Sequence, residues 1–260
     1  MFQRIRALTQ TTTYLGLVMI AIVWGGIYHL IKEEREHAVD SAARQGSNLT
    51  RAFEEYIARV IKGADTSLLV LRQVYENDPK NFNLDRWTSG GGLKNDLVIQ
   101  FILAGAAGYA TLSSLAPLPA PIDVGDRDYF QFHANSTSDE LYVGAPVIGR
   151  VSNRATIQLA RRLRAPDGAF GGVVVASLDI EGIEKFYNSI DIGPGGVITL
   201  VGLDGIVRAR SGRGPEAREM IGRSLAQSKV FELIRQAPAG NYWNYQTSFV
   251  AVEGVNRLIS

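Results

Sequence analysis

An uncharged apolar run near the N-terminus constrains this chain more than any other feature. The run spans Tyr14 to Ile31 and has the roughly 17–25 residues that a helix needs to cross a bilayer. Only His29 interrupts its apolar surface, whereas a soluble core helix of this length would carry a polar stripe. The sequence therefore predicts a transmembrane helix over residues 13–32. We expect it to stay uncleaved, with a cleaved signal peptide as the alternative, because no small-residue cleavage site follows the run.

The charges that flank this run predict its orientation. The segment before it carries Arg4 and Arg6 and no acid, and the segment KEEREHAVD after it is net acidic. Positively charged flanks stay in the cytoplasm. We therefore expect residues 1–12 to form a cytoplasmic tail and everything after Lys32 to be exported.

The composition excludes several classes of function. The chain has no cysteine, and its formal net charge is +1. Disulfides, thiolate metal sites and cysteine nucleophiles are therefore ruled out, and there is no basic excess of the kind that nucleic-acid binding requires.

A second long helix is predicted to continue directly from the first. Apolar or small residues recur in steps of three and four from Glu33 to about Asn77, with no proline until Asp78-Pro79. This spacing is typical of an amphipathic helix, here over residues 33–78. Its apolar stripe has two interpretations, packing on its own domain or a homodimer seam near the membrane. The small residues that would let two copies approach at that seam are Ala42, Ala43 and Gly46.

Short strands replace the helical pattern after a further helical piece at about residues 84–93. The alternation and the turn signals predict an antiparallel sheet with one helical excursion in GDRDYFQFHANS, residues 125–136. The glycine pair in FGGVVV predicts a bulge or close packing. The strands of this first unit, residues 79–190, are expected at 96–103, 109–115, 141–150, 156–164 and 170–180.

The order of elements then begins again over residues 191–260. A hairpin turns at Asp204-Gly205, a helix is expected at 216–236, and further strands at 241–250 and 255–260. This unit lacks one strand relative to the first, so we expect the second unit to be incomplete in this chain. The fold class is α+β, with two antiparallel-sheet units in tandem behind the two helices.

The chain resembles a known family through four motifs that follow one another in a fixed order. They are DRDYFQFH, LYVGAPVIGR, IQLARRLRAPDGAFGGVVVASLD and GGVITLVGLDGIVRAR. From about residue 33 to residue 260 the chain resembles the double Cache (PDC, PAS-like) sensor region of bacterial membrane diguanylate cyclases and histidine kinases. The resemblance implies an anchor in the inner membrane with the bulk of the chain in the periplasm. It also implies a ligand pocket in the membrane-distal unit, and a cytoplasmic output domain beyond this chain.

The resemblance also implies ligand-binding residues. In amino-acid-binding members an arginine holds the ligand carboxylate, a tyrosine lines the pocket and an aspartate takes the amine. Arg127, Tyr142 and Asp179 are the matching positions, and Tyr129 stands where those members have tryptophan. From the residues themselves, Asp126 is expected to cap the helix that follows it.

Strand alternation adds further candidates. It places Arg161 on the same face as Ile157, Leu159 and Leu163, where a guanidinium needs an anion. Asp179, at the end of the neighbouring strand, is one candidate partner, and a ligand carboxylate or phosphate is the other. Ser177 shares a face with Asp179.

His133 lies one helical turn after Tyr129 and is expected to be a hydrogen-bonding residue of the segment over the pocket. Neither a metal site nor a cofactor is expected, since one histidine makes no metal site. The chain shows no catalytic motif, so no catalytic residue is assigned. The sequence thus predicts a sensor for a small anionic or amino-acid-like metabolite. The alternatives are a ligand-free structural or dimerisation module and, more remotely, a membrane-anchored exported enzyme.

Overall fold

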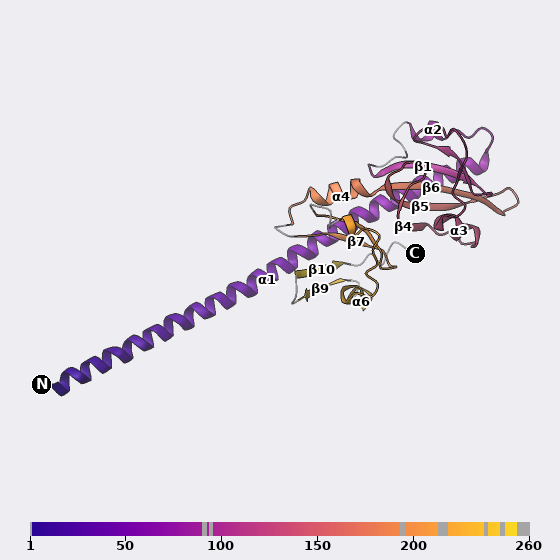
Figure 1. Ribbon diagram of the computed structural model, residues 1–260. Helices are drawn as coiled ribbons and strands as arrows, with labels where there is room; N and C mark the ends of the chain where they lie inside the picture. Colours follow the sequence, from indigo (N-terminus) through magenta and orange to yellow (C-terminus); the bar gives the residue numbers. More distant parts are fainter. Residues whose placement is uncertain are drawn as a thin grey trace. The chain divides into compact units, whose positions relative to one another are not determined.

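The computed structural model describes residues 2–89, 93, 96–192, 196–212, 218–236, 239–244 and 248–253. The chain forms two units, one of residues 1–52 with 239–253 and the other containing residues 53–238. The architecture is α+β, as predicted, with one long helix, a six-stranded antiparallel sheet and smaller two-stranded sheets (Figure 1).

Helix α1 runs without interruption over Phe2–Asn77. It ends directly before Asp78-Pro79, where the proline restricts the residue before it to non-helical conformations. One stretch of this helix is long and apolar enough to cross a membrane. All side chains described between Tyr14 and Ala38 are exposed.

The main sheet has the strand order β3-β2-β1-β6-β5-β4. The hairpin of β1 with β2 and the long pairing of β5 with β6 confirm the sequence prediction. Strand β3 was not predicted, because it occupies only two residues at the end of a proline-rich connector. The strands are β1 (Val98–Gly105), β2 (Tyr109–Ser113), β3 (Ile122–Asp123), β4 (Tyr142–Ile148), β5 (Ala155–Arg164) and β6 (Phe170–Asp179).

The two faces of this sheet carry different elements. Helix α1 lies on one face, where its Asp65 binds Arg161 of β5. The short helix α2 (Leu84–Thr88) follows α1 in the chain. Helix α3 (Asp128–Ala134) packs on the other face. The core beneath α3 is buried and apolar, and it consists of Ile102, Ala104, Ala110, Val124, Tyr129, Phe130, Ala160, Val173 and Val175.

The glycine pair at the start of β6 produces the predicted close packing. Gly172 has φ +121°, and a Cβ added there would lie 2.0 Å from the main-chain oxygen of Ala104. Only glycine fits such a backbone. The pairing of β5 with β6 also shifts register between Leu163 and Arg164, which confirms an irregularity at this end of the strand.

Helix α4 (Ile180–Asn188) follows β6 and packs on the adjacent part of α1 through aromatic rings. Phe53 meets Tyr187 edge to face at 5.1 Å, and Tyr56 stacks on Phe186 at 3.8 Å between ring centroids. The hairpin of β7 (Thr199–Val201) and β8 (Val207–Arg210) then turns at Asp204-Gly205, as predicted. Gly205 has the positive φ, +79°, that this turn needs.

The helix predicted over 216–236 is not continuous, because residues 220–228 are not helical. Helix α6 covers Lys229–Gln236. Residues before it run beside β8 instead, with hydrogen bonds from Val207 N to Arg223 O and from Gly222 N to Val207 O, both 2.9 Å long. Gly222 has φ +82°, a backbone conformation that an α-helix does not contain. Strand β8 also offers main-chain hydrogen-bond partners, which satisfy the backbone groups of the segment beside it without a helix.

The last described strands also differ from the prediction. The single strand expected at 241–250 is a hairpin of β9 (Ala239–Asn244) with β10 (Ser248–Glu253). The strand predicted at 255–260 lies outside the described residues.

Candidate ligand site

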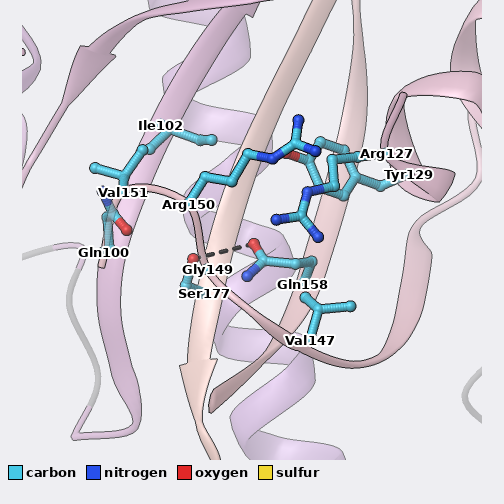
Figure 2. A pocket seen from close by; sticks show the side chains of 10 residues that line it. All are labelled: Gln100, Ile102, Arg127, Tyr129, Val147, Gly149, Arg150, Val151, Gln158 and Ser177. Atoms are coloured by element: carbon cyan, nitrogen blue, oxygen red, sulfur yellow. Dashed lines mark hydrogen bonds between the residues drawn. The ribbon is translucent and has the colours of Figure 1, made fainter. Parts of the chain in front are cut away.

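A hollow lies on the α3 face of the sheet (Figure 2). Its cavity volume is about 20 Å³, roughly the room of one water molecule. It is lined by residues of four strands, β1, β4, β5 and β6, of α3 and its N-terminal flank, and of the loop after β4. The lining consists of Gln100, Ile102, Arg127, Tyr129, Val147, Gly149, Arg150, Val151, Gln158 and Ser177.

The floor of this hollow is polar and neutral. Gln100 donates to the hydroxyl of Ser113 at 2.9 Å. Gln158 accepts from the hydroxyl of Ser177 at 3.0 Å and donates to that of Thr156 at 2.7 Å. All five side chains belong to buried residues, and buried amides are stable only when they are hydrogen-bonded in this way. The floor therefore offers fixed amide and hydroxyl groups rather than charges.

Two guanidinium groups supply the charge of the lining. Arg127 Nη2 donates to the main-chain oxygen of Ile148 at 3.0 Å. Arg150 binds both carboxylate oxygens of Asp126 at 2.5 and 2.6 Å and the main-chain oxygen of Asp123 at 2.7 Å. Figure 2 shows the side chain of Arg150 extending toward Tyr129 and that of Arg127 extending toward Gln158, which is hydrogen-bonded to Ser177.

The expected capping role of Asp126 is wrong. The N-cap position of α3 is Arg127, with no side-chain cap, and Asp128 occupies the first turn. The two charge-assisted bonds from Arg150 are stronger than one cap bond, so the carboxylate of Asp126 turns toward that guanidinium. The same hydrogen bonds lower the pKa of Asp126.

Tyr129, two residues after Arg127, also lines the hollow. Its side chain is buried, and desolvation raises the pKa of its hydroxyl to about 12. The hydroxyl is therefore protonated at neutral pH and can donate a hydrogen bond.

The structure separates Asp179 from Ser177. Ser177 lines the hollow, whereas Asp179 lies beyond the lining and pairs with Arg154, with 2.7 Å between Oδ2 and Nη2. Arg154 also reaches Glu181 at 3.4 Å. The second oxygen of Asp179, Oδ1, is buried and has no hydrogen-bond partner within the described part of the chain.

Arg161 is absent from the lining, and its expected pairing with Asp179 is wrong. Alternation does place it with the apolar side chains, but that face is covered by α1. There Nε and Nη2 of Arg161 bind the two oxygens of Asp65 at 2.7 and 2.8 Å. The strand register explains the error, since Arg161 pairs with Val174 and Asp179 pairs with Thr156, five residues away on β5.

His133 and Tyr142 support the α3 segment from outside the hollow. His133 is fully buried, and its Nε2 bonds to the main-chain oxygen of Ala160 at 3.0 Å. Burial lowers its pKa. Tyr142 is half-buried against the ring of Phe132, 5.3 Å between centroids, and desolvation raises the pKa of its hydroxyl.

Arg150, Gln100 and Gln158 line the hollow, yet sequence reasoning missed all three. Arg150 follows the end of a strand, where periodicity carries no information. The two glutamines did carry a signal, because each is a polar residue inside an otherwise apolar strand. Such residues are buried only with hydrogen-bond partners.

No protein-family model and no curated protein matches the chain. Among solved structures, the extracellular domain of rpHK1S-Z16, a protein assigned as a histidine kinase, is 26% identical with a TM-score of 0.74. The match covers 85% of this chain and 92% of that one.

Two other similar structures share the fold at lower identity. The ligand-binding domain of the Pseudomonas fluorescens chemoreceptor CtaA, solved with L-isoleucine, is 14% identical with a TM-score of 0.62. The match covers 87% of this chain and 92% of that one. The ligand-binding domain of the Campylobacter jejuni chemoreceptor Tlp3, solved with 4-methylisoleucine, is 13% identical with a TM-score of 0.53. It covers 79% of this chain and 83% of that one.

These proteins are sensor domains of kinases and chemoreceptors rather than enzymes, and an apolar N-terminal helix fits a membrane protein with an extracytoplasmic domain. In its order of motifs and its fold, the chain is therefore similar to Cache-type extracellular ligand-binding domains of histidine kinases and chemoreceptors.

Proposed function

We propose that this chain senses a small anionic metabolite in the periplasm and passes the signal along α1 to a cytoplasmic output domain of diguanylate cyclase or histidine kinase type. In this proposal residues 1–12 stay in the cytoplasm and residues 13–32 cross the inner membrane. Residues 79–190 form the membrane-distal ligand-binding unit, and residues 191–260 belong to the membrane-proximal unit.

The charge of the hollow carries the proposal. Its lining includes two arginines and no acidic side chain. The carboxylate that binds Arg150, that of Asp126, is largely exposed. Guanidinium groups favour carboxylate and phosphate ligands because their paired N–H groups match two oxygens. A small anion is therefore the ligand that these residues would hold best.

A ligand larger than water needs more room than the hollow provides. We expect Arg127 and Arg150 to swing outward, because each now bonds to groups that a ligand carboxylate can replace. These groups are the main-chain oxygen of Ile148 and the exposed carboxylate of Asp126. Such side-chain rearrangements are common when a site closes on its ligand.

The signal requires a ligand that prefers one of two arrangements of the protein, since equal affinity for both would shift nothing. We expect two copies of the chain to meet along α1 below the sensor, where Ala42, Ala43 and Gly46 permit close approach. Within the residue 53–238 unit, α1 is tied to the sheet by the ion pair of Asp65 with Arg161.

The test uses the full chain in detergent and measures its melting temperature with L-lactate, L-malate, succinate and inorganic phosphate, against sodium chloride of equal ionic strength. We expect at least one anion to raise the melting temperature, since a ligand that binds only the folded state stabilises it. Arg127→Ala and Arg150→Ala should abolish the rise. The control is Arg86→Ala, which removes an exposed arginine of α2. A rise that survives both hollow variants contradicts this site.

A ligand-free structural module is the second candidate, and the small volume of the hollow favours it. It predicts that none of these anions changes the melting temperature. It also predicts that Arg150→Ala destabilises the chain, because the bonds to Asp126 and Asp123 then serve the fold alone.

A further inference from the structure

We infer that Arg154 makes this site selective for carboxylates that lack an ammonium group, such as hydroxy acids, over the corresponding amino acids. The inference rests on the proposed function, since it concerns the ligand of the same hollow. Its basis is that the carboxylate best placed to bind an ammonium group is already paired with a cation of the chain.

Asp179 is that carboxylate. It lies two residues beyond Ser177 on β6, so alternation puts both side chains on the face that carries the hollow. The opposite strand agrees, since Gln158 pairs with Ser177 at the hollow and Thr156 pairs with Asp179 next to it. The side chain of Asp179 is only 12% exposed. It therefore lies beside the lining of the hollow and is largely shielded from bulk solvent.

Arg154 fills the position that a ligand cation would take. Its Nη2 is 2.7 Å from Oδ2 of Asp179 and 3.4 Å from Glu181. An ammonium group entering beside Asp179 would have to displace a guanidinium that is held by two carboxylates. Without that exchange it would stand among cations, because Arg127 and Arg150 line the rest of the hollow.

The main chain holds Arg154 in place beside the hollow. The amide of Gly149, a lining residue, donates to the main-chain oxygen of Arg154 at 2.9 Å. The amide of Arg154 in turn donates to the hydroxyl of Ser152 at 3.4 Å. Asn153 between them adopts φ +51°, a left-handed conformation that asparagine tolerates. The guanidinium thus extends from a hydrogen-bonded loop at the start of β5, with its side chain 44% exposed.

The same geometry predicts what removal of Arg154 does. Oδ1 of Asp179 already lacks a hydrogen-bond partner within the described residues. Loss of the guanidinium leaves the whole carboxylate buried and unpaired, and a ligand ammonium group can then compensate it. The variant should therefore gain affinity for amino acids while its affinity for hydroxy acids changes little.

The experiment is titration calorimetry on the full chain in detergent with matched ligand pairs that differ only in an ammonium or a hydroxyl group. The pairs are L-serine with L-glycerate, L-valine with (S)-2-hydroxy-3-methylbutanoate, and L-isoleucine with its 2-hydroxy analogue. We expect the parent to bind the hydroxy acid at least about tenfold more tightly in any pair that binds, the worth of one charge-assisted hydrogen bond. Arg154→Ala should remove or reverse that preference.

Two further variants keep the result interpretable. Arg154→Lys retains a cation beside Asp179 and should keep the preference, and Arg86→Ala, far along the chain in α2, should leave it unchanged. A parent that binds an amino acid as tightly as its hydroxy analogue overturns the inference, as does an unchanged ratio in Arg154→Ala. A parent that binds no member of any pair overturns this inference as well, whereas the proposed function fails only if the anions of the melting test also leave the melting temperature unchanged.

Discussion

Removal of the Asp65 carboxylate would leave Arg161 without its counter-charge on the face of the sheet that α1 covers. The side chains of Arg161 and Asp65 are 14% and 20% exposed, and two hydrogen bonds join them. Asp65→Ala deletes both acceptors at once. Arg161 keeps one other acceptor, the main-chain oxygen of Asp139.

The cost follows from this burial. Breaking a fully buried ion pair by removing one partner costs about 3–5 kcal/mol. The partial exposure of both side chains and the remaining bond to Asp139 reduce this to about 2–3 kcal/mol. A domain of this size loses roughly 2–4 °C of melting temperature per kcal/mol. We therefore expect Asp65→Ala to melt about 4–12 °C below the parent.

The assay is thermal unfolding of the full chain in detergent, followed by intrinsic fluorescence. The matched control is Asp40→Ala, which removes an exposed aspartate from the same helix and should change the melting temperature little, because exposed charges contribute little. A double variant, Asp65→Leu with Arg161→Met, replaces both charges by apolar groups of similar size. We expect it to be within about 1 kcal/mol of the parent, since apolar replacement of a buried pair is often neutral.

Two results would refute this reasoning. An unchanged melting temperature in Asp65→Ala would mean that the pair does not hold α1 to the sheet. A double variant as unstable as the single one would mean that packing volume, rather than the stranded guanidinium, causes the loss.

Two other predictions concern pH and assembly. Burial lowers the pKa of His133 below its unfolded value of 6.5, so the unfolded chain binds more protons at this residue than the folded chain does. The contribution of His133 to the free energy of unfolding should therefore be complete above about pH 6.5 and should decrease as the pH falls below that value. His133→Gln, which can still donate to Ala160 O, should flatten that fall in melting temperature between pH 7.5 and 5, and a parent equally stable across this range would contradict the burial argument. Because the chain has no cysteine, Gly46→Cys should give a disulfide-linked dimer in oxidised membranes far faster than Asn48→Cys, on another side of α1. Equal rates at both positions would argue against the helix seam.

The sequence was informative wherever local rules decide the structure. Proline placement and three-to-four spacing predicted one helix ending at Asn77, and period-two alternation predicted which side chains of β5 share a face. The turn at Asp204-Gly205 and the close packing at Gly172 follow from the conformations that only glycine adopts easily. These features depend on neighbours in the chain, so no tertiary information was needed.

Tertiary structure decided which partner each charged group found. Alternation placed Arg161 on an apolar face but could not show that α1 covers that face, because Asp65 is 96 residues away in sequence. Asp126 was expected to cap α3, but Arg127 occupies the N-cap position and Asp126 binds Arg150. Both outcomes depend on strand register and on which layer lies over which face. Those are long-range properties that spacing along the chain does not encode, whereas the apolar N-terminal helix, the hairpin of β1 with β2 and the pairing of β5 with β6 were evident from the sequence.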